Sequence, residues 1–334
     1  MVVFQALFLA SSVDCFLHGH GDATLKGVAL GVSLLAVALN SQWAFVLAEV
    51  VWFAVFAKAH LEGNKPSSSP ASKTTSGKRE GEDGAGQGGP QVDANAPPPE
   101  LKRVVDASMV QFLKNVEGTH TCDNQPWTLV TQKEGVRAYS AVYPNQKFLR
   151  WRIEVDDLYG PSNEVYDELF DFEKRCGPKG WDEAIAWGRV IRQYSDGYRV
   201  VNYSPAPAAG GLISGREFVE GRVIQRSPDG SVLAAGTGLE QSKWKSIIPE
   251  FPAPKEGLTV GLGYPGGGVR ITPAPGEPQD VNVPRKHKFV LVTNADLGGW
   301  LFPSVINTAT PQALVDSTIF TKQHLDRKFK RPVP

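Results

Sequence analysis

The separation of apolar residues into blocks constrains the fold of this 334-residue chain more than any other feature. Residues 1–61 are rich in apolar side chains, residues 62–100 contain almost no bulky ones, and residues 101–334 mix apolar and polar side chains as a folded domain does. A segment that cannot bury apolar surface does not offset the entropy lost on folding. We therefore expect three parts: a membrane-anchor segment, a disordered linker and one folded domain.

The membrane anchor is predicted from two apolar runs. Residues 27–39 and 43–57 contain one polar side chain each, Ser33 and Glu49. A spanning helix needs about 20 apolar residues, so the two runs form either a helical hairpin or one long tilted span. Residues 2–17 are a candidate for a further short span. The alternative is a hydrophobic helix packed in a soluble core. The expected fold therefore includes N-terminal transmembrane helices.

The linker is recognised by its composition. Gly, Pro and Ser supply 18 of the 39 residues in 62–100, and Val92 is the only bulky apolar side chain. Several Lys and Arg residues follow the apolar runs, at positions 58, 65, 73, 78 and 79. Positive charge collects on the cytosolic side of membrane segments, so the part that follows the anchor is expected to face the cytosol.

The folded domain contains helical and strand-like patterns in a mixed order. Apolar residues recur every three or four positions in 101–116 and 161–176, and in a final helix with Thr310 as cap, Pro311 at its start and an end near Arg331. Alternating or β-branched runs occur at 135–143, 148–156, 197–204, 217–225, 231–236 and 287–294. Short turns between runs, such as residues 227–230, favour antiparallel pairing. These patterns predict an α+β fold with a curved antiparallel sheet around a long C-terminal helix.

Several function classes are excluded by composition and motifs. The formal net charge is zero, so no basic surface for nucleic acid is expected. Cys15, Cys122 and Cys176 lie far apart and lack metal-ligand spacing, so neither a disulfide framework nor a zinc site is expected. GxSxG, HExxH and GxxxxGK[ST] motifs are absent. We therefore expect no enzyme activity, no cofactor and no metal. The Pro- and Gly-rich stretch 243–283 reads as an insertion without an assignable role.

The most informative run is YSPAPAAGGLISGREFVEGRVIQR, residues 203–226. Its first half has the small-residue composition of a surface loop with an apolar tip, Leu212 followed by an isoleucine. Its second half alternates as a strand, so Phe218, Glu220 and Arg222 share one face. Alternation alone does not say whether this face points inward or to solvent.

This run resembles the core signature of the START domain, the steroidogenic-acute-regulatory-related lipid-transfer family. The family pattern is a small-residue loop, then Arg-Asp/Glu-Phe-Val, then an inward-facing Arg. Trp181 and the segments DLGGWL at 296–301 and VIN at 305–307 match further family features in the same order. The sterol-carrying branch is the most similar, including a late-endosomal member anchored by a MENTAL region. Residues 45–53 resemble the last span of that anchor.

The resemblance implies a helix-grip fold that encloses one lipid in an apolar tunnel, covered by the final helix and a loop at 205–215. It implies a non-enzymatic intracellular lipid transfer protein for sterol, most simply cholesterol, tethered to a membrane such as that of the late endosome. The expected partners are a single lipid and membranes. The side chains expected to contact the lipid are Arg222, Glu220, Tyr203, Trp181, Phe218, Leu212 and Leu325.

One departure from the family concerns the buried Arg222. In the sterol branch its counterpart is paired with an acidic residue, and that position holds Tyr203 in this chain. A buried Arg needs an acceptor. Glu220 lies two residues away on the same strand face, so we expect Glu220 or the Tyr203 hydroxyl to hold Arg222 near the polar end of the lipid.

Two other functions stay open at this level. A phospholipid carrier of the same fold needs further inward-facing donors for the phosphate, and Arg192, Arg199 and Arg216 are the candidates. A lipid-sensing membrane adaptor would capture a partner protein without transferring lipid. The sequence leaves the identity of the lipid open.

Overall fold

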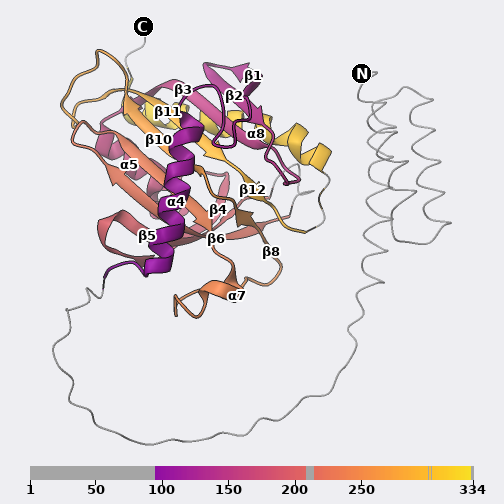
Figure 1. Ribbon diagram of the computed structural model, residues 1–334. Helices are drawn as coiled ribbons and strands as arrows, with labels where there is room; N and C mark the ends of the chain where they lie inside the picture. Colours follow the sequence, from indigo (N-terminus) through magenta and orange to yellow (C-terminus); the bar gives the residue numbers. More distant parts are fainter. Residues whose placement is uncertain (1–94, 208–213, 300, 302, 332–334) are drawn as a thin grey trace, which may run out of the picture. The chain divides into compact units, whose positions relative to one another are not determined.

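The computed structural model describes residues 95–207, 214–299, 301 and 303–331 (Figure 1). The chain divides into two compact units, residues 1–86 and 87–334, and every described residue belongs to the second. The predicted anchor at 1–61 and the linker up to residue 94 therefore lie outside the described residues. Within the described part, no helix is both long enough and apolar enough to cross a membrane.

The domain is built on a ten-stranded sheet in the order β1-β2-β3-β11-β10-β7-β6-β5-β4, with β8 paired to β6. Neighbours along this path are antiparallel, whereas β8 runs parallel to β6. The main strands are β1 (Thr128–Lys133), β2 (Val136–Ala141), β3 (Arg150–Gly160), β4 (Ile185–Gln193), β5 (Tyr198–Pro205), β6 (Arg216–Arg226), β7 (Val232–Gly238), β10 (Gly267–Pro273) and β11 (Arg285–Thr293). Shorter strands are β8 (Thr259–Val260), β9 (Leu262–Gly263) and β12 (Ala295–Asp296), and the last two pair with each other.

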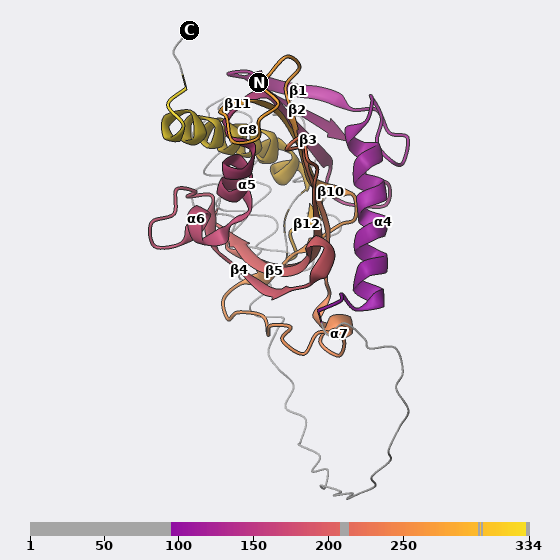
Figure 2. The ribbon, with the colours of Figure 1, turned by 90° about the vertical axis from the view of Figure 1, so that its left-hand side faces the viewer.

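Helices cover both faces of the curved sheet, as Figure 2 shows. The helices are α4 (Pro99–Val116), α5 (Ser162–Phe170), α6 (Phe172–Cys176), α7 (Gln241–Trp244) and α8 (Pro303–Lys328). On one face lies α4, while α5, α6 and α8 lie on the other. This arrangement confirms the predicted α+β fold with an antiparallel sheet and a long C-terminal helix.

Each face of the sheet has its own hydrophobic core. Leu101, Val105 and Phe112 of α4 recur at helical spacing and are fully buried. Because an i, i+4, i+11 series shares one side of a helix, this side packs against β5, β6, β7 and β11. On the other face, Val315 and Ile319 of α8 pack with residues of β2, β3, β7, β10 and β11.

Local signals account for several turns and boundaries. The predicted turn at 227–230 joins β6 to β7, where Gly230 adopts φ +82° and Ser227 N donates to Ser231 O at 2.9 Å. The predicted helix 161–176 is instead two helices. Asp171 breaks the run with an extended backbone, and its side chain accepts from Glu173 N as the cap of α6.

Two further sequence predictions are wrong. The last helix begins at Pro303 and contains Pro311 in its interior, whereas Pro311 was expected at its start. Pro303 occupies the first helical turn, where a missing N–H costs little, and packing of the α8 face overrides the break expected at Pro311. The Gly-rich stretch near residue 267 is the start of β10, a strand inside the sheet. A Cβ on Gly268 would lie 2.3 Å from Ala234 O, so the glycine permits close approach to β7.

Candidate functional site

A cavity of about 470 Å³ lies between the inner face of the sheet and α8. Nine strands contribute to its wall (β3, β4, β5, β6, β7, β9, β10, β11 and β12), together with α5, α6 and α8. Small-molecule sites in proteins commonly enclose roughly 300–1,000 Å³. The space is therefore large enough for one organic molecule of moderate size, and it lies beneath the last helix as expected.

The wall is mainly apolar, and its charge is confined to two places. Arg175, Glu220 and Arg222 are the charged side chains among the described residues that line it. Arg175 is already committed to Asp182, to which its Nε donates at 2.9 Å. The charged groups available to a guest molecule are therefore concentrated around Glu220 and Arg222.

Strand β6 places this pair by simple alternation. Phe218, Glu220 and Arg222 line the cavity, whereas the intervening residues face α4. Gly221 is required on the α4 side, because a Cβ there would lie 2.6 Å from Leu101 Cδ1. The packing of α4 thus decides which face of β6 is inward, and the solvent-facing alternative for residues 220 and 222 is excluded.

Glu220 joins Tyr203 and Arg222 in one hydrogen-bonded cluster. The Tyr203 hydroxyl donates to Glu220 Oε1 at 2.8 Å, and Arg222 Nε donates to Glu220 Oε2 at 2.8 Å. Arg222 Nη2 also lies 2.7 Å from Oε2. The expected replacement for the missing acid is therefore present: Glu220 pairs with Arg222, and Tyr203 supports Glu220.

The environment fixes the protonation of this cluster. Burial lowers the pKa of the Arg222 guanidinium, but the Glu220 carboxylate and the Tyr203 hydroxyl outweigh burial, so the net pKa is raised. Burial, reinforced by the charge of Glu220, raises the pKa of the Tyr203 phenol. Arg222 is therefore a cation and Tyr203 a neutral donor throughout the physiological pH range.

Aromatic rings hold the cluster in position. The Tyr203 ring stacks between Phe218, at 5.5 Å between centroids, and Phe172 of α6, at 6.2 Å. The Arg222 guanidinium carbon lies 5.0 Å from the centre of the Tyr203 ring. Gly236, directly opposite on β7, leaves room for the arginine, since a Cβ there would lie 2.8 Å from Arg222 Cγ.

Helix α8 presents a threonine-rich side to the cavity. Thr310, Thr318 and Thr321 line it, and each hydroxyl donates to the carbonyl four residues earlier in the helix, at 2.6, 2.8 and 2.9 Å. These hydroxyls are satisfied without a guest. The helix therefore places polar residues on the wall without requiring polar contacts from the molecule inside.

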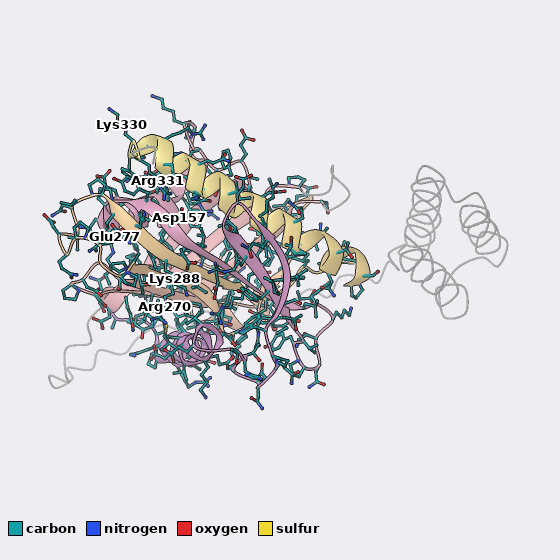
Figure 3. All side chains as sticks on the ribbon, turned by 90° about the horizontal axis from the view of Figure 1, so that it is seen from above. Asp157, Arg270, Glu277, Lys288, Lys330 and Arg331 are labelled. Carbon is teal, nitrogen blue, oxygen red and sulfur yellow. The ribbon has the colours of Figure 1, made fainter. Side chains whose placement is uncertain are left out.

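Ion pairs attach the C-terminal half of α8 to the rest of the domain. Buried Glu168 accepts from His324 Nε2 at 2.7 Å and from Lys328 Nζ at 2.6 Å. Asp157 pairs with Lys322 at 3.0 Å and with Arg331 at 3.0 Å. Figure 3 shows Asp157 and Arg331 near this end of the helix. Among the described residues of the N-terminal half, Asn307 is the one whose side chain hydrogen-bonds outside the helix: its Oδ1 accepts from Leu149 N at 3.2 Å.

The seven site residues predicted from the sequence do not all lie on the cavity wall. Tyr203, Phe218, Glu220 and Arg222 line the cavity together. Leu212 lies outside the described residues, as does most of the predicted covering loop. The remaining two, Trp181 and Leu325, are described but do not line the cavity. Lipid contact stays a prediction for all seven.

Trp181 and Leu325 have other contacts. The Trp181 ring stacks on His324 of α8 at 4.3 Å between centroids. Leu325 is fully buried in the core beneath α8. It continues the cavity-facing side of the helix one turn beyond Thr321, the last α8 residue on the wall. The spacing therefore identified the correct side of the helix, but the cavity ends before that turn.

Sequence reasoning missed much of the wall. Residues on α6, β7, β10 and the first half of α8 contribute, among them Phe172, Ala234, Val269 and Leu314. The apolar spacing around Phe172 and Leu314 was a usable signal, whereas the glycine-rich β10 gave none. Within the described residues, no group of three or more His, Cys, Asp or Glu side chains is placed to hold a metal ion.

Comparisons with known proteins agree with this architecture. StAR-related lipid transfer protein 5 of Homo sapiens is 26% identical over 215 residues, which cover 64% of this chain and 89% of that protein. The mitochondrial steroidogenic acute regulatory protein of Equus caballus is 26% identical over 218 residues, covering 64% and 66%. The solved structure of human StAR-related lipid transfer protein 5 superposes with a TM-score of 0.51 at 24% identity, covering 70% of this chain and 96% of that one. The START domain model matches residues 121–330. This chain therefore belongs to the START-domain family.

Proposed function

We propose that this protein binds a single lipid in the cavity beneath α8 and carries it between membranes without chemical change. The observation that supports the proposal is the cavity itself, about 470 Å³ of mainly apolar wall with one charged cluster, Glu220 and Arg222, besides the Arg175 that pairs with Asp182. Burying apolar surface contributes roughly 25 cal/mol per Å², so a hydrocarbon body supplies most of the binding free energy.

The cluster of Tyr203, Glu220 and Arg222 orients the guest. A buried hydroxyl without a partner costs about 1–3 kcal/mol, so the polar end of the lipid binds where donors and acceptors are available. Arg222 uses Nε and Nη2 on Glu220. Its Nη1 and the second lone pairs on the carboxylate are the groups a sterol hydroxyl would contact. A sterol has one such hydroxyl, and the wall offers it one charged cluster, which makes sterol our first choice of guest.

Opening of the cavity is assigned to the N-terminal half of α8. That half lines the cavity through Ile306, Thr310 and Leu314, while the ion pairs to Glu168 and Asp157 are on the other half. Pro311 lacks the N–H that would bond to the carbonyl of Asn307, so the helix is weakest between the two halves. Loosening residues 303–310 uncovers the wall while the C-terminal half stays attached.

Tethering remains part of the proposal and is supported by the apolar runs in residues 1–61 and the basic residues after them. The anchor would hold the folded domain on the cytosolic face of an intracellular membrane. The likeness of residues 45–53 to the last span of the MENTAL anchor makes the late endosome the candidate organelle. Microscopy of the tagged full-length chain beside a chain lacking residues 1–61 tests this, and equal distribution of the two contradicts tethering.

The decisive experiment is lipid extraction and mass spectrometry on the purified full-length chain, followed by transfer of the lipid found between donor and acceptor vesicles. One lipid per protein and protein-dependent transfer are expected. A bound lipid without transfer would favour the sensing adaptor. Absence of any lipid, with no binding of added sterol or phospholipid, would contradict the proposal.

A further inference from the structure

Arg199 of β5 is buried without an acceptor for its charge. It is 8% exposed, and its Nε and Nη2 have no hydrogen-bond partner. The other buried arginines of the described part each donate to a side-chain or carbonyl oxygen: Arg150, Arg152, Arg216 and Arg285. An uncompensated guanidinium is costly to bury. The position therefore needs an acceptor that the described chain does not supply.

The charges around Arg199 make an acceptor for its guanidinium more necessary. Arg199 lies directly opposite Arg222 in the β5–β6 pairing, so both side chains share the inner face of the sheet. Glu220 is hydrogen-bonded to Arg222, which leaves one positive charge in excess. Burial, together with the charge of Arg222, lowers the pKa of Arg199 to about 10, so it remains protonated at neutral pH.

Nearby acids do not neutralise it. Asp167 lies 3.4 Å from Lys174 Nζ and 3.7 Å from Arg226 Nη2. Asp171 accepts from Glu173 N at 2.9 Å as the cap of α6 and forms no ion pair with Arg199 within 4.0 Å. The acids nevertheless surround the site with negative charge, which disfavours a guest that carries more than one negative charge.

A second space of about 360 Å³ adjoins Arg199. We call it the Arg199 pocket; its wall includes Arg189, Arg199, Tyr166, Phe170 and Phe172, together with the acidic residues Asp167, Asp171 and Glu173. The guanidinium carbon lies 5.8 Å from the centre of the Phe170 ring, so an aromatic face covers one side of the cation. The unpartnered Nε and Nη2 form one edge of the guanidinium fork, which matches two oxygens of an oxyanion.

We propose that the Arg199 pocket binds a singly charged oxyanion, a carboxylate or a sulfate ester, on Nε and Nη2 of Arg199. The anion has two possible sources. Phe170 and Phe172 line both this pocket and the main cavity, so the anion can be the polar end of the guest lipid, reaching past these rings. It can equally be a small soluble anion. The first source rests on the proposed function, and the second does not.

The test compares three probes on the full-length chain by calorimetric titration: cholesterol, cholesterol sulfate and methyl sulfate. The variant is Arg199→Met, and the matched control is Arg192→Met, because Arg192 lies on the neighbouring strand β4, pairs with exposed Glu250 and lines neither space. We expect Arg199→Met to weaken binding of at least one sulfate probe by about tenfold or more, and Arg192→Met to leave it unchanged. Cholesterol binding should change little in either variant.

Stability supplies a second, ligand-free readout. Replacing an unpaired buried charge by an apolar side chain of similar length removes a cost, so lipid-free Arg199→Met should unfold at the same temperature as wild type or higher. A clearly lower unfolding temperature overturns the inference, because it means that an internal partner such as Asp171 already serves the arginine. Equal sulfate affinity in wild type, Arg199→Met and Arg199→Lys overturns it as well, since Arg199→Lys keeps the charge and loses the fork.

The probes also separate this inference from the proposed function. An Arg199-dependent response to methyl sulfate supports a soluble anion, and a response to cholesterol sulfate alone supports the lipid-borne source. Cholesterol binding without any Arg199-dependent sulfate binding leaves the lipid carrier intact and overturns the oxyanion site. Methyl sulfate binding that requires Arg199, with no sterol or sterol sulfate bound, supports the site and contradicts the sterol carrier.

Discussion

Glu220→Gln tests the polar cluster because it removes a charge while keeping the shape of the side chain. In the structure Glu220 accepts from Tyr203 and from two nitrogens of Arg222. Breaking a buried ion pair by neutralising one partner costs about 3–5 kcal/mol. The Arg222 and Glu220 side chains keep 22% and 14% of their surface accessible along the cavity. We therefore reduce the expected loss of unfolding free energy to about 2–3 kcal/mol.

The assay is thermal and urea unfolding of the lipid-free protein. For a domain of this size, each kcal/mol lowers the melting temperature by roughly 2–4 °C, so Glu220→Gln should melt about 4–12 °C below wild type. The double variant Glu220→Gln/Arg222→Leu removes the stranded charge and should recover part of this loss. Glu250→Gln is the control, since its pair with Arg192 is exposed and contributes about 0–1 kcal/mol.

The reasoning is refuted by either of two results. If Glu220→Gln melts with the wild type, the carboxylate does not compensate a buried charge. If the double variant is less stable than Glu220→Gln by the full cost of a second, independent loss, the two side chains are not coupled.

Three further predictions follow from packing and charge. Phe112→Ala should lower the unfolding free energy by about 3–5 kcal/mol, because the Phe112 side chain of α4 is fully buried against the sheet. Val110 is exposed on the same helix, so Val110→Ala should change the unfolding free energy by less than about 0.5 kcal/mol in urea titrations. Leu314→Trp should fill the cavity from α8 and lower the amount of lipid bound per protein without loss of helix content, as measured by lipid extraction and circular dichroism; unchanged stoichiometry would argue against this wall. Burial raises the pKa of Glu168, but hydrogen bonds from Lys328 and His324 outweigh burial, so the net pKa is lowered in the folded protein. The stabilisation that Glu168 provides should therefore be complete above its pKa in the unfolded chain, and it should be lost as the pH falls through its pKa in the folded protein. Glu168→Gln should therefore flatten the acid side of a stability–pH curve, and an unchanged curve would contradict this assignment.

Pattern reasoning succeeded where one local rule was enough. Strand alternation placed Phe218, Glu220 and Arg222 on one face, and the chemistry of a buried arginine predicted Glu220 or the Tyr203 hydroxyl as its partner. The side that faces inward could not be read from β6, because α4 decides it from more than 100 residues earlier in the chain. Glu220, the acceptor for Arg222, lies on the same strand and was therefore predictable. The residues that surround this pair come from distant parts of the chain and were not.

Tertiary context decided the remaining points. Glycine is a poor strand former, so the stretch that begins β10 resembled an insertion, yet pairing with β7 and β11 overrides this preference. Thr321 and Leu325 share one side of α8. Thr321 lies on the cavity wall and Leu325 in the hydrophobic core, because the cavity ends between them. Trp181 is predicted to contact the lipid, and in the structure its ring stacks on His324 outside the cavity wall.

The part of the wall formed by β7 and β10 is built largely from small residues, with Ala234, Gly236 and its pairing partner Gly267 among them. The cavity thus exists because two neighbouring strands carry small residues where they face it. Each methyl group added at Ala234 would reduce the cavity volume available to the guest, while the backbone hydrogen bonds between the strands stay unchanged. Relatives with the same backbone can therefore be matched to larger or smaller hydrocarbon skeletons by trading side-chain volume at a few inward positions.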